Sequence, residues 1–173
     1  MLTSSKKRSL KILQDIDQAI FVMHSAGKWL EESGKNPSKW WKPQNMNRDF
    51  LLRHAEPNEF YVVLVGEKPA VAEILQDNQR NQSWKSVDGD QKKSALYIHW
   101  LCVGREFAGS KLPKTLIDFA ALQAKKRNLK LLRLDTNADE TKLRKIYEDL
   151  GFSLVRIERE TYQKTAFYQK TVD

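Results

Sequence analysis

The sequence predicts a mixed α/β (α+β) fold in a single domain that spans residues 1–173. Short β-rich runs alternate with segments of helical periodicity, in the order β-α-α-β-β-β followed by α-β-α-β-β. A length of 173 residues suits one domain with a full core, and no internal repeat or linker divides the chain. Apolar residues make up 40% of the chain and charged residues 30%, which is typical of a globular protein and excludes a disordered one.

The first half begins with a predicted strand over residues 9–13 and a long helix that Asp15 or Asp17 can cap. The apolar face of that helix includes Ile16, and the helix ends by Gly34. Prolines indicate a loop over residues 36–43, which carries two adjacent tryptophans. A short helix over residues 47–54 follows.

Residues 59–65 and 70–75 are predicted strands joined into a hairpin by the turn at residues 66–69. Residues 76–93 are too polar for a core and are interpreted as an exposed excursion that carries Trp84. Residues 94–103 are apolar on both faces, which predicts a strand in the centre of the sheet.

The second half continues with a helix over residues 110–127, for which Ser110 is the predicted N-cap and Pro113 lies in the first turn. Residues 129–135 form the next predicted strand. Another helix begins at Asp139, the expected N-cap, and ends at Gly151. Residues 152–157 and 165–171 are the closing strands.

The formal net charge of +8 favours an anionic partner, either nucleic acid, an acidic membrane surface or a phosphate-bearing ligand. Basic residues cluster near the start, among them Lys6 and Lys7, and again at residues 125–130, and either cluster can equally be a solvated face. No nucleic-acid motif is present and the basic residues follow no single helix face, so nucleic-acid binding is the less favoured alternative.

The single cysteine, Cys102, lies in an apolar run and is interpreted as a small core residue. It can form no internal disulfide, which fits a reducing compartment. No apolar run is long enough to span a bilayer, and the basic N-terminus lacks the apolar region of a signal peptide. We therefore expect a cytoplasmic protein with no membrane association.

Residues 101–120 combine the end of an apolar strand, a turn with two glycines and the start of a helix. This geometry directs backbone N–H groups at a phosphate. An ordinary strand-to-helix connection is the alternative interpretation, because short glycine motifs have a high false-positive rate.

Three motifs in this order resemble the Gcn5-related N-acetyltransferase (GNAT) superfamily. They are the strand ending Leu-Cys-Val at residue 103 with the Phe-Ala-Gly-Ser-Lys-Leu-Pro loop after it, the strand Leu-Arg-Leu-Asp-Thr ending at residue 136, and the segment Ile-Tyr-Glu-Asp-Leu-Gly-Phe ending at residue 152. The resemblance implies a mixed, mostly antiparallel sheet of six to seven strands flanked by about four helices. It also implies transfer of an acetyl group from acetyl-CoA to a primary amine by direct attack.

The resemblance assigns acetyl-CoA, the co-substrate, to the strand end, the glycine loop and two later positions. The residues implied are Leu101, Cys102, Val103, Ala108, Gly109, Ser110, Lys111, Leu112, Pro113, Lys114, Asn137 and Tyr147. The loop departs from the family pattern, because Ala108, Lys111 and Pro113 stand where Arg or Gln, Gly, and Gly or Ala are usual. Lys111 keeps its N–H and adds a cation, whereas Pro113 has no N–H to donate.

The resemblance implies that Tyr147 protonates the leaving thiolate; helical spacing alone favours a core residue. Asp135 ends a strand at the carboxyl edge and is a candidate general base, or equally a cap for the next segment. His99 is a second candidate base, or a buried core histidine, and alternation predicts that it faces the same side as Leu101 and Val103. Glu73 is a weaker third candidate.

Trp40, Trp41 and Trp84 are the predicted acceptor-side residues, although the first two can also simply pin their loop to the core. The acceptor can be a small polyamine or amino sugar, an amino-acid derivative, or a peptide N-terminus or lysine. No cluster of histidine, cysteine and acidic residues predicts a metal site. A GNAT-fold protein that binds a coenzyme A ester without catalysis is the alternative, and the family resemblance also implies a possible homodimer.

Overall fold

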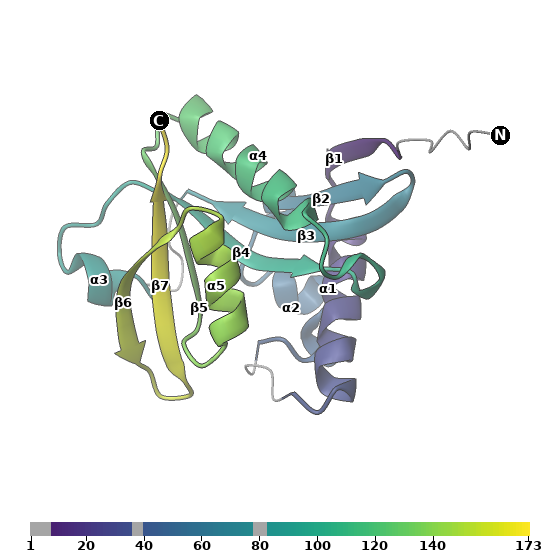
Figure 1. Ribbon diagram of the computed structural model, residues 1–173, viewed down its shortest axis with the longest axis horizontal. Coiled ribbons are helices and arrows are strands. Elements are labelled where there is room, and N and C mark those ends of the chain that lie inside the picture. Colours follow the sequence, from purple (N-terminus) through teal and green to yellow (C-terminus); the bar gives the residue numbers. More distant parts are fainter. Residues whose placement is uncertain (1–7, 36–39, 78–82) are drawn as a thin grey trace.

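The computed structural model describes residues 8–35, 40–77 and 83–173, in which seven strands form one sheet and five α-helices flank it (Figure 1). The strands are β1 (Leu10–Gln14), β2 (Phe60–Val65), β3 (Lys68–Gln76), β4 (Leu96–Val103), β5 (Leu131–Asn137), β6 (Ser153–Arg159) and β7 (Lys164–Thr171). The helices are α1 (Ile16–Glu32), α2 (Arg48–Leu51), α3 (Lys85–Asp88), α4 (Leu112–Lys126) and α5 (Thr141–Asp149). The strand order is β1-β2-β3-β4-β5-β7-β6, and only β4 and β5 pair in parallel, which confirms the predicted mixed, mostly antiparallel sheet.

Helix α1 packs on one face of the sheet. Asp15 caps it as predicted, since the Asp15 carboxylate accepts a 3.0 Å hydrogen bond from the backbone N–H of Gln18. The buried stripe of the helix joins β2, β3 and α2 in one core cluster, to which Val22 and Met23 contribute. Gly27 allows a close approach, because a Cβ there would lie 2.9 Å from the carbonyl oxygen of Trp41.

Helices α4 and α5 pack on the opposite face and bury a second core cluster, to which Leu116, Leu134 and Tyr147 belong. Both predicted N-caps of these helices are wrong. Lys111 occupies the cap position of α4 and Glu140 that of α5, and neither makes a side-chain capping bond. The polar side chains nearby are engaged in the preceding turns instead; for example, Asn137 Oδ1 accepts a 3.0 Å bond from the N–H of Asp139.

The parallel pair β4–β5 is short. The two strands are in register only at Leu96 with Leu132 and at Tyr97 with Arg133. Beyond these pairs the described strands diverge, and Figure 1 shows the gap between them, with α5 on one side and α1 on the other. The edge of β4 that faces β5 therefore keeps its backbone groups free of ladder bonds from that neighbour.

Most described residues of the segment before β4 are exposed, as its polarity predicts, but Trp84 and the side chain of Asp88 are buried. Trp84 is 2% exposed and packs with Tyr97 and Phe167 in a third core cluster on the sheet, and Arg133 stacks over the Trp84 ring at 4.4 Å. Asp88 departs from the prediction because it is paired inside the fold with Arg133.

Several predictions fall outside the described residues: the basic residues Lys6 and Lys7, residues 36–39 of the predicted loop, and residues 78–82 of the polar segment. Within the described part of the chain, none of the helices has both the length and the apolar character needed to cross a membrane.

Candidate active site

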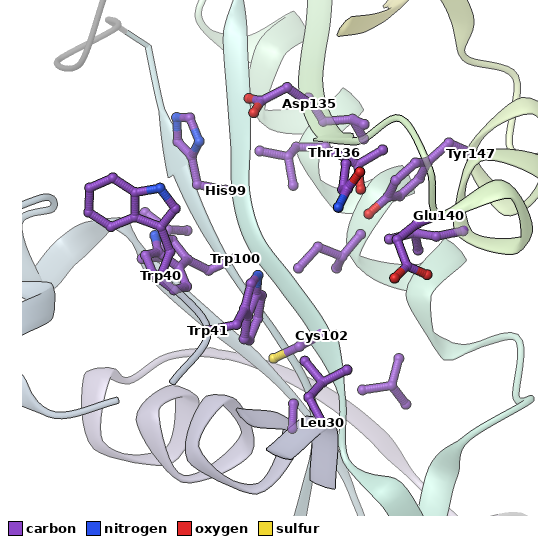
Figure 2. A pocket seen from close by; sticks show the side chains of 18 of the residues that line it. Leu30, Trp40, Trp41, His99, Trp100, Cys102, Asp135, Thr136, Glu140 and Tyr147 are labelled. Carbon is purple, nitrogen blue, oxygen red and sulfur yellow. The ribbon is translucent and has the colours of Figure 1, made fainter. Parts of the chain in front are cut away.

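A cavity of about 600 Å³ opens where β4 and β5 diverge, and it passes between the two faces of the sheet. Its volume falls within the range of about 300–1,000 Å³ that is usual for small-molecule sites. One side is lined by α5 and by the apolar residues Leu101, Val103 and Leu134; the other side is lined by the C-terminal part of α1 and by tryptophans (Figure 2).

A bulge in β4 shapes the middle of this cavity. Ala72 of β3 pairs with Cys102, and Ile74, two residues later, pairs with His99, so β4 carries one residue more than β3. The backbone accommodates the extra residue at Trp100, whose φ of +57° is a strained conformation for a residue with a large side chain.

The bulge reverses the expected direction of His99. Its ring stacks on Tyr97, with a 6.3 Å centroid distance and an angle of 10° between the planes, so both rings lie on the same face of the sheet. Leu101 and Val103 pack against the opposite core cluster, with α4. The prediction that His99 faces the same side as these residues is therefore wrong, because simple alternation does not hold across a bulge.

Tyr147 approaches the cavity from α5. Its ring contacts Phe152 and Tyr168 with centroid distances of 6.3 and 6.2 Å, and Figure 2 shows its hydroxyl directed into the space between α5 and β4. Burial raises the pKa of this phenol above its ordinary value, and the charge of Asp135 raises it further, so the hydroxyl keeps its proton at neutral pH. Tyr147 is thus both a core residue and a wall of the cavity, which combines the two roles considered for it.

Asp135 lies on the other face. Because Arg133 packs against Trp84 there, Asp135, two residues later on β5, points to the same side, and Figure 2 shows its carboxylate directed towards the side of His99. Burial, followed by the charge of Glu160, raises the pKa of Asp135 to about 6. The side chain that hydrogen-bonds the turn after β5 is that of Asn137, whose Oδ1 accepts from the N–H of Asp139.

Not all backbone N–H groups of residues 109–114, the glycine loop, are free to bind a phosphate. The N–H of Ser110 donates to the carbonyl of Phe107 at 3.2 Å, that of Lys114 to the carbonyl of Lys111 at 3.2 Å, and that of Leu112 to Ser110 Oγ at 3.4 Å. Pro113 has no N–H. The amides of Gly109 and Lys111 have no hydrogen-bond partner among the described residues, so these two are the available donors.

A second cavity of about 210 Å³ connects this loop to the first one. Trp29, Ala26 and Val103 line both cavities, and Ala108 and Gly109 line the smaller one. Arg105 lies beside it with its guanidinium 4.4 Å from the centre of the Trp29 ring, which adds a cation next to the loop. Residues 110–114 line neither cavity and lie at the start of α4.

A model of the acetyltransferase (GNAT) family matches residues 24–152. This chain belongs to the GNAT family. The match covers more than half of the chain and includes both divergent strands, the glycine loop and Tyr147.

Solved structures agree with this GNAT fold over nearly the whole chain. A GNAT acetyltransferase from Listeria monocytogenes is 19% identical with a TM-score of 0.69, and the alignment covers 99% of this chain and 98% of that one. A GNAT acetyltransferase from Streptococcus agalactiae is 16% identical (TM-score 0.68, coverage 95% and 96%). The PaiA N-acetyltransferase from Thermoplasma acidophilum, solved with coenzyme A, is 16% identical (TM-score 0.67, coverage 94% and 99%). No curated protein matches.

The predicted acceptor tryptophans of this GNAT protein separate into two places. Trp40 and Trp41 line the main cavity, whereas Trp84 is buried on the far side of Tyr97 and lines neither cavity. We therefore do not retain Trp84 among the acceptor residues. Cys102 lines the cavity as a buried thiol, and burial raises its pKa above the ordinary value, which keeps it unreactive.

Three residues that line the main cavity escaped sequence reasoning: His54, Trp100 and Tyr162. Glu160 lines neither cavity, but its charge raises the pKa of Asp135. Trp100 lies in a strand that is apolar throughout, where only the bulge decides which way it points. Tyr162 and Glu160 belong to the turn between β6 and β7, which no motif singles out. Glu73 is buried beneath α4 with Val71 and Leu75 and lines neither cavity. Among the described residues no group of three or more His, Cys, Asp or Glu side chains is arranged to hold a metal ion.

Proposed function

We propose that this GNAT protein transfers an acetyl group from acetyl-CoA to a primary amine by direct attack. The observation that carries this proposal is the cavity between β4 and β5, which has a protonated phenol, Tyr147, on one face of the sheet and a carboxylate, Asp135, on the other. A transfer reaction needs an acid for the leaving group and a base for the nucleophile, and here the two are separated by the space in which the reacting atoms would meet.

The remaining geometry fits coenzyme A as the acetyl donor. The amides of Gly109 and Lys111 are available to the pyrophosphate, and Arg105 adds a positive charge beside them. The smaller cavity leads from there past Val103 into the larger one. The edge of β4 beyond Tyr97, free of β5, offers backbone groups along which the pantetheine arm and the thioester can lie.

The chemistry assigned to each residue follows from its pKa. An acceptor amine enters as an ammonium ion and gives one proton to Asp135, whose pKa of about 6 suits a base near neutral pH. The free amine attacks the thioester carbonyl carbon and forms a C–N bond, which leaves a positively charged nitrogen with one proton too many for an amide. As the C–S bond breaks, that nitrogen gives its extra proton to solvent and Tyr147 gives its proton to the leaving sulfur. Tyr147 then recovers a proton from solvent and Asp135 releases the one it accepted, so the products are an amide, free coenzyme A and one proton.

Thermal shift with acetyl-CoA, followed by thiol release with a panel of primary amines, tests this proposal. We expect the melting temperature to rise with acetyl-CoA and free thiol to appear with at least one amine. Stabilisation without thiol release from any amine would favour binding without catalysis, a reading that the small number of free loop amides supports. No stabilisation at all would overturn the proposal.

A further inference from the structure

The acceptor side of the cavity has a continuous aromatic wall. The ring of Trp41 lies 5.2 Å from that of Trp100, and Trp100 meets Phe50 edge-on at 6.3 Å. Phe50 contacts His54 at 5.0 Å, and His54 contacts Trp40 at 5.4 Å. The three tryptophans, which Figure 2 shows, and His54 line the cavity, and Phe50 of α2 supports them from behind.

The charge at this end of the cavity is negative. Asp135 faces the aromatic wall, with Glu160 near enough to affect its ionisation. Burial lowers the pKa of His54, and it lowers that of His99 to about 4, so both imidazoles are neutral at neutral pH. Carboxylate and π faces together attract an organic cation and disfavour an anion.

The cations near this end of the cavity do not lie beside Asp135. Arg53 stacks behind the wall, with its guanidinium 5.2 Å from the centre of the Phe50 ring, and does not line the cavity. Of the described residues that line the cavity, only Lys35 and Lys142 carry a permanent positive charge. Lys35 lies 5.0 Å from the ring of Trp29, beside the smaller cavity, and Lys142 belongs to α5 on the opposite face of the sheet. Neither is placed to neutralise a carboxylate that an acceptor would bring next to Asp135.

The two walls of the acceptor end are joined to each other. The side chains of Trp40 and Tyr162 are hydrogen-bonded, and the Tyr162 hydroxyl also bonds to Glu160. Thr165 Oγ1 donates to Glu160 at 2.5 Å and fixes that carboxylate to β7. Among the described residues, this chain of contacts connects the β6–β7 turn to the loop before α2 and crosses the acceptor end of the cavity, where it obstructs an extended chain.

Resting on the proposed acetyl transfer, we infer that the acceptor is a small primary amine with an aromatic or aliphatic body and with no carboxylate next to its nitrogen. The body packs on the wall formed by Trp40, Trp41 and Trp100. The ammonium group lies between that wall and Asp135. An α-carboxylate would lie beside Asp135 and Glu160, and none of the described residues that line the cavity places a cation there to pair with it. A peptide would have to pass the Trp40–Tyr162 contact.

Four amines, compared in pairs, test separately whether the acceptor must lack a carboxylate and whether it must carry an aromatic body. Tyramine and ethanolamine carry no carboxylate, and tyrosine and serine are the same molecules with an α-carboxylate added. We expect kcat/KM for tyramine to exceed that for tyrosine and for ethanolamine by at least about tenfold each, with serine lowest. A tetraalanine amide, which has a free N-terminus and no carboxylate, is expected to be at least about tenfold poorer than tyramine.

Any other ranking of the kcat/KM values would contradict one specific part of the inference. Equal use of tyrosine would contradict exclusion of the carboxylate, equal use of ethanolamine would contradict the role of the aromatic wall, and preference for the peptide would contradict a small acceptor. If none of the amines releases thiol, the proposed acetyl transfer fails instead. Calorimetric titration of tyramine and tyrosine into the protein with coenzyme A then still decides the acceptor: tighter binding of tyramine supports the inference, and equal or weaker binding overturns it.

Trp41→Leu tests the wall directly, because leucine keeps an apolar side chain and removes the π face. We expect it to reduce the preference for tyramine over ethanolamine by about tenfold. Phe21→Leu is the matched control, since Phe21 is an aromatic residue of α1 that is 65% exposed and lines neither cavity. Trp40→Leu is the second variant if Trp41→Leu lowers the melting temperature. An unchanged preference in a folded variant would contradict the wall.

Discussion

The guanidinium of Arg133 and the carboxylate of Asp88 form a bidentate ion pair inside the protein, with N–O distances of 2.8 and 2.9 Å and side chains that are 0% and 3% exposed. Arg133 also stacks on Trp84 and lies 3.4 Å from the Tyr97 hydroxyl. Burial raises the pKa of Asp88, but the hydrogen bonds from Arg133 and from the backbone N–H of Lys93, together with the charges of these two residues, leave that pKa below its ordinary value, so the pair stays charged at neutral pH. The pair anchors the segment around α3 to β5.

Loss of one partner should therefore destabilise the protein strongly. We expect Asp88→Asn to lower the free energy of unfolding by about 3 kcal/mol, because it leaves the Arg133 charge buried without its counter-ion. Urea denaturation measures this loss. Asp77→Asn is the control, since the Arg127–Asp77 pair spans 3.3 Å and is partly exposed, and its loss should cost less than about 1 kcal/mol. Equal losses in the two variants would show that the buried pair contributes no more to the free energy of unfolding than the exposed one.

Glu73 should make stability depend on pH. It is fully buried, neither carboxyl oxygen has a hydrogen-bond partner among the described residues, and burial raises its pKa well above the ordinary value of 4.5. Above that value the unfolded state loses a proton that the folded state keeps, so stability falls as pH rises, by at most about 1.4 kcal/mol per pH unit. Urea denaturation between about pH 5 and about pH 8 should show this slope reduced in Glu73→Gln. Glu67→Gln, in the exposed β2–β3 turn, should leave the slope unchanged. An unreduced slope in Glu73→Gln would show that other groups cause the pH dependence.

Tyr147→Phe tests the assigned acid. We expect kcat for thiol release to fall by about a hundredfold, since the leaving sulfur then has no positioned proton donor. Tyr168→Phe is the matched control, because the Tyr168 ring contacts Tyr147 but its hydroxyl donates to Glu148 and accepts from Arg144, each at 2.9 Å. That variant should lose stability and keep kcat. Unchanged turnover in Tyr147→Phe would remove the acid role.

The pH profile of kcat/KM distinguishes the two candidate bases. Because a general base must be deprotonated, activity should fall below the pKa of the base as pH decreases. Burial raises the pKa of Asp135 to about 6 and lowers that of His99 to about 4. A fall in kcat/KM with an acidic inflection near pH 6 therefore indicates Asp135 as the base, and an inflection near pH 4 indicates His99. We expect the acidic inflection of the kcat/KM profile near pH 6. Asp135→Asn should abolish this inflection, and His99→Gln should retain it.

Gly109→Ala tests the phosphate loop. Gly109 has a φ of +75° and a Cβ there would meet nothing within 4 Å, so the change costs about 1 kcal/mol of backbone strain without a clash inside the protein. The added Cβ would hinder approach of a phosphate, and we expect coenzyme A to bind about tenfold more weakly in a calorimetric titration. Gly66→Ala in the β2–β3 turn has a matching φ of +65° and equally open space, so it should show the strain without the loss of affinity. Similar affinities in the two variants would argue against contact of the loop with phosphate.

Sequence reasoning predicted the features that depend on local pattern. The alternation of strands and helices, the Asp15 cap, the central position of β4 and the family motifs around Gly109 and Tyr147 are all encoded by residues close together in the chain. Periodicity and capping act over a few residues, so a single sequence carries them. Trp40, Trp41 and Asp135, which the family resemblance suggested as acceptor-side residues and a candidate base, line one cavity, and their roles stay predictions.

Tertiary contacts decided the rest. The extra residue in β4 turns His99 to the face of Asp135 and puts Trp100 against Trp41, and only pairing with β3 shows where that residue is accommodated. The pairing of Asp88 with Arg133 buries one carboxylate of a segment that is otherwise mostly exposed, as its polarity predicts. The cap positions of α4 and α5 moved because turns before them use the polar side chains first. In the first two cases a partner distant in sequence changes the energy of a local choice, which the local pattern cannot contain. In the caps the competing hydrogen bond is itself local, between residues two apart, and only the structure shows which polar side chain makes it.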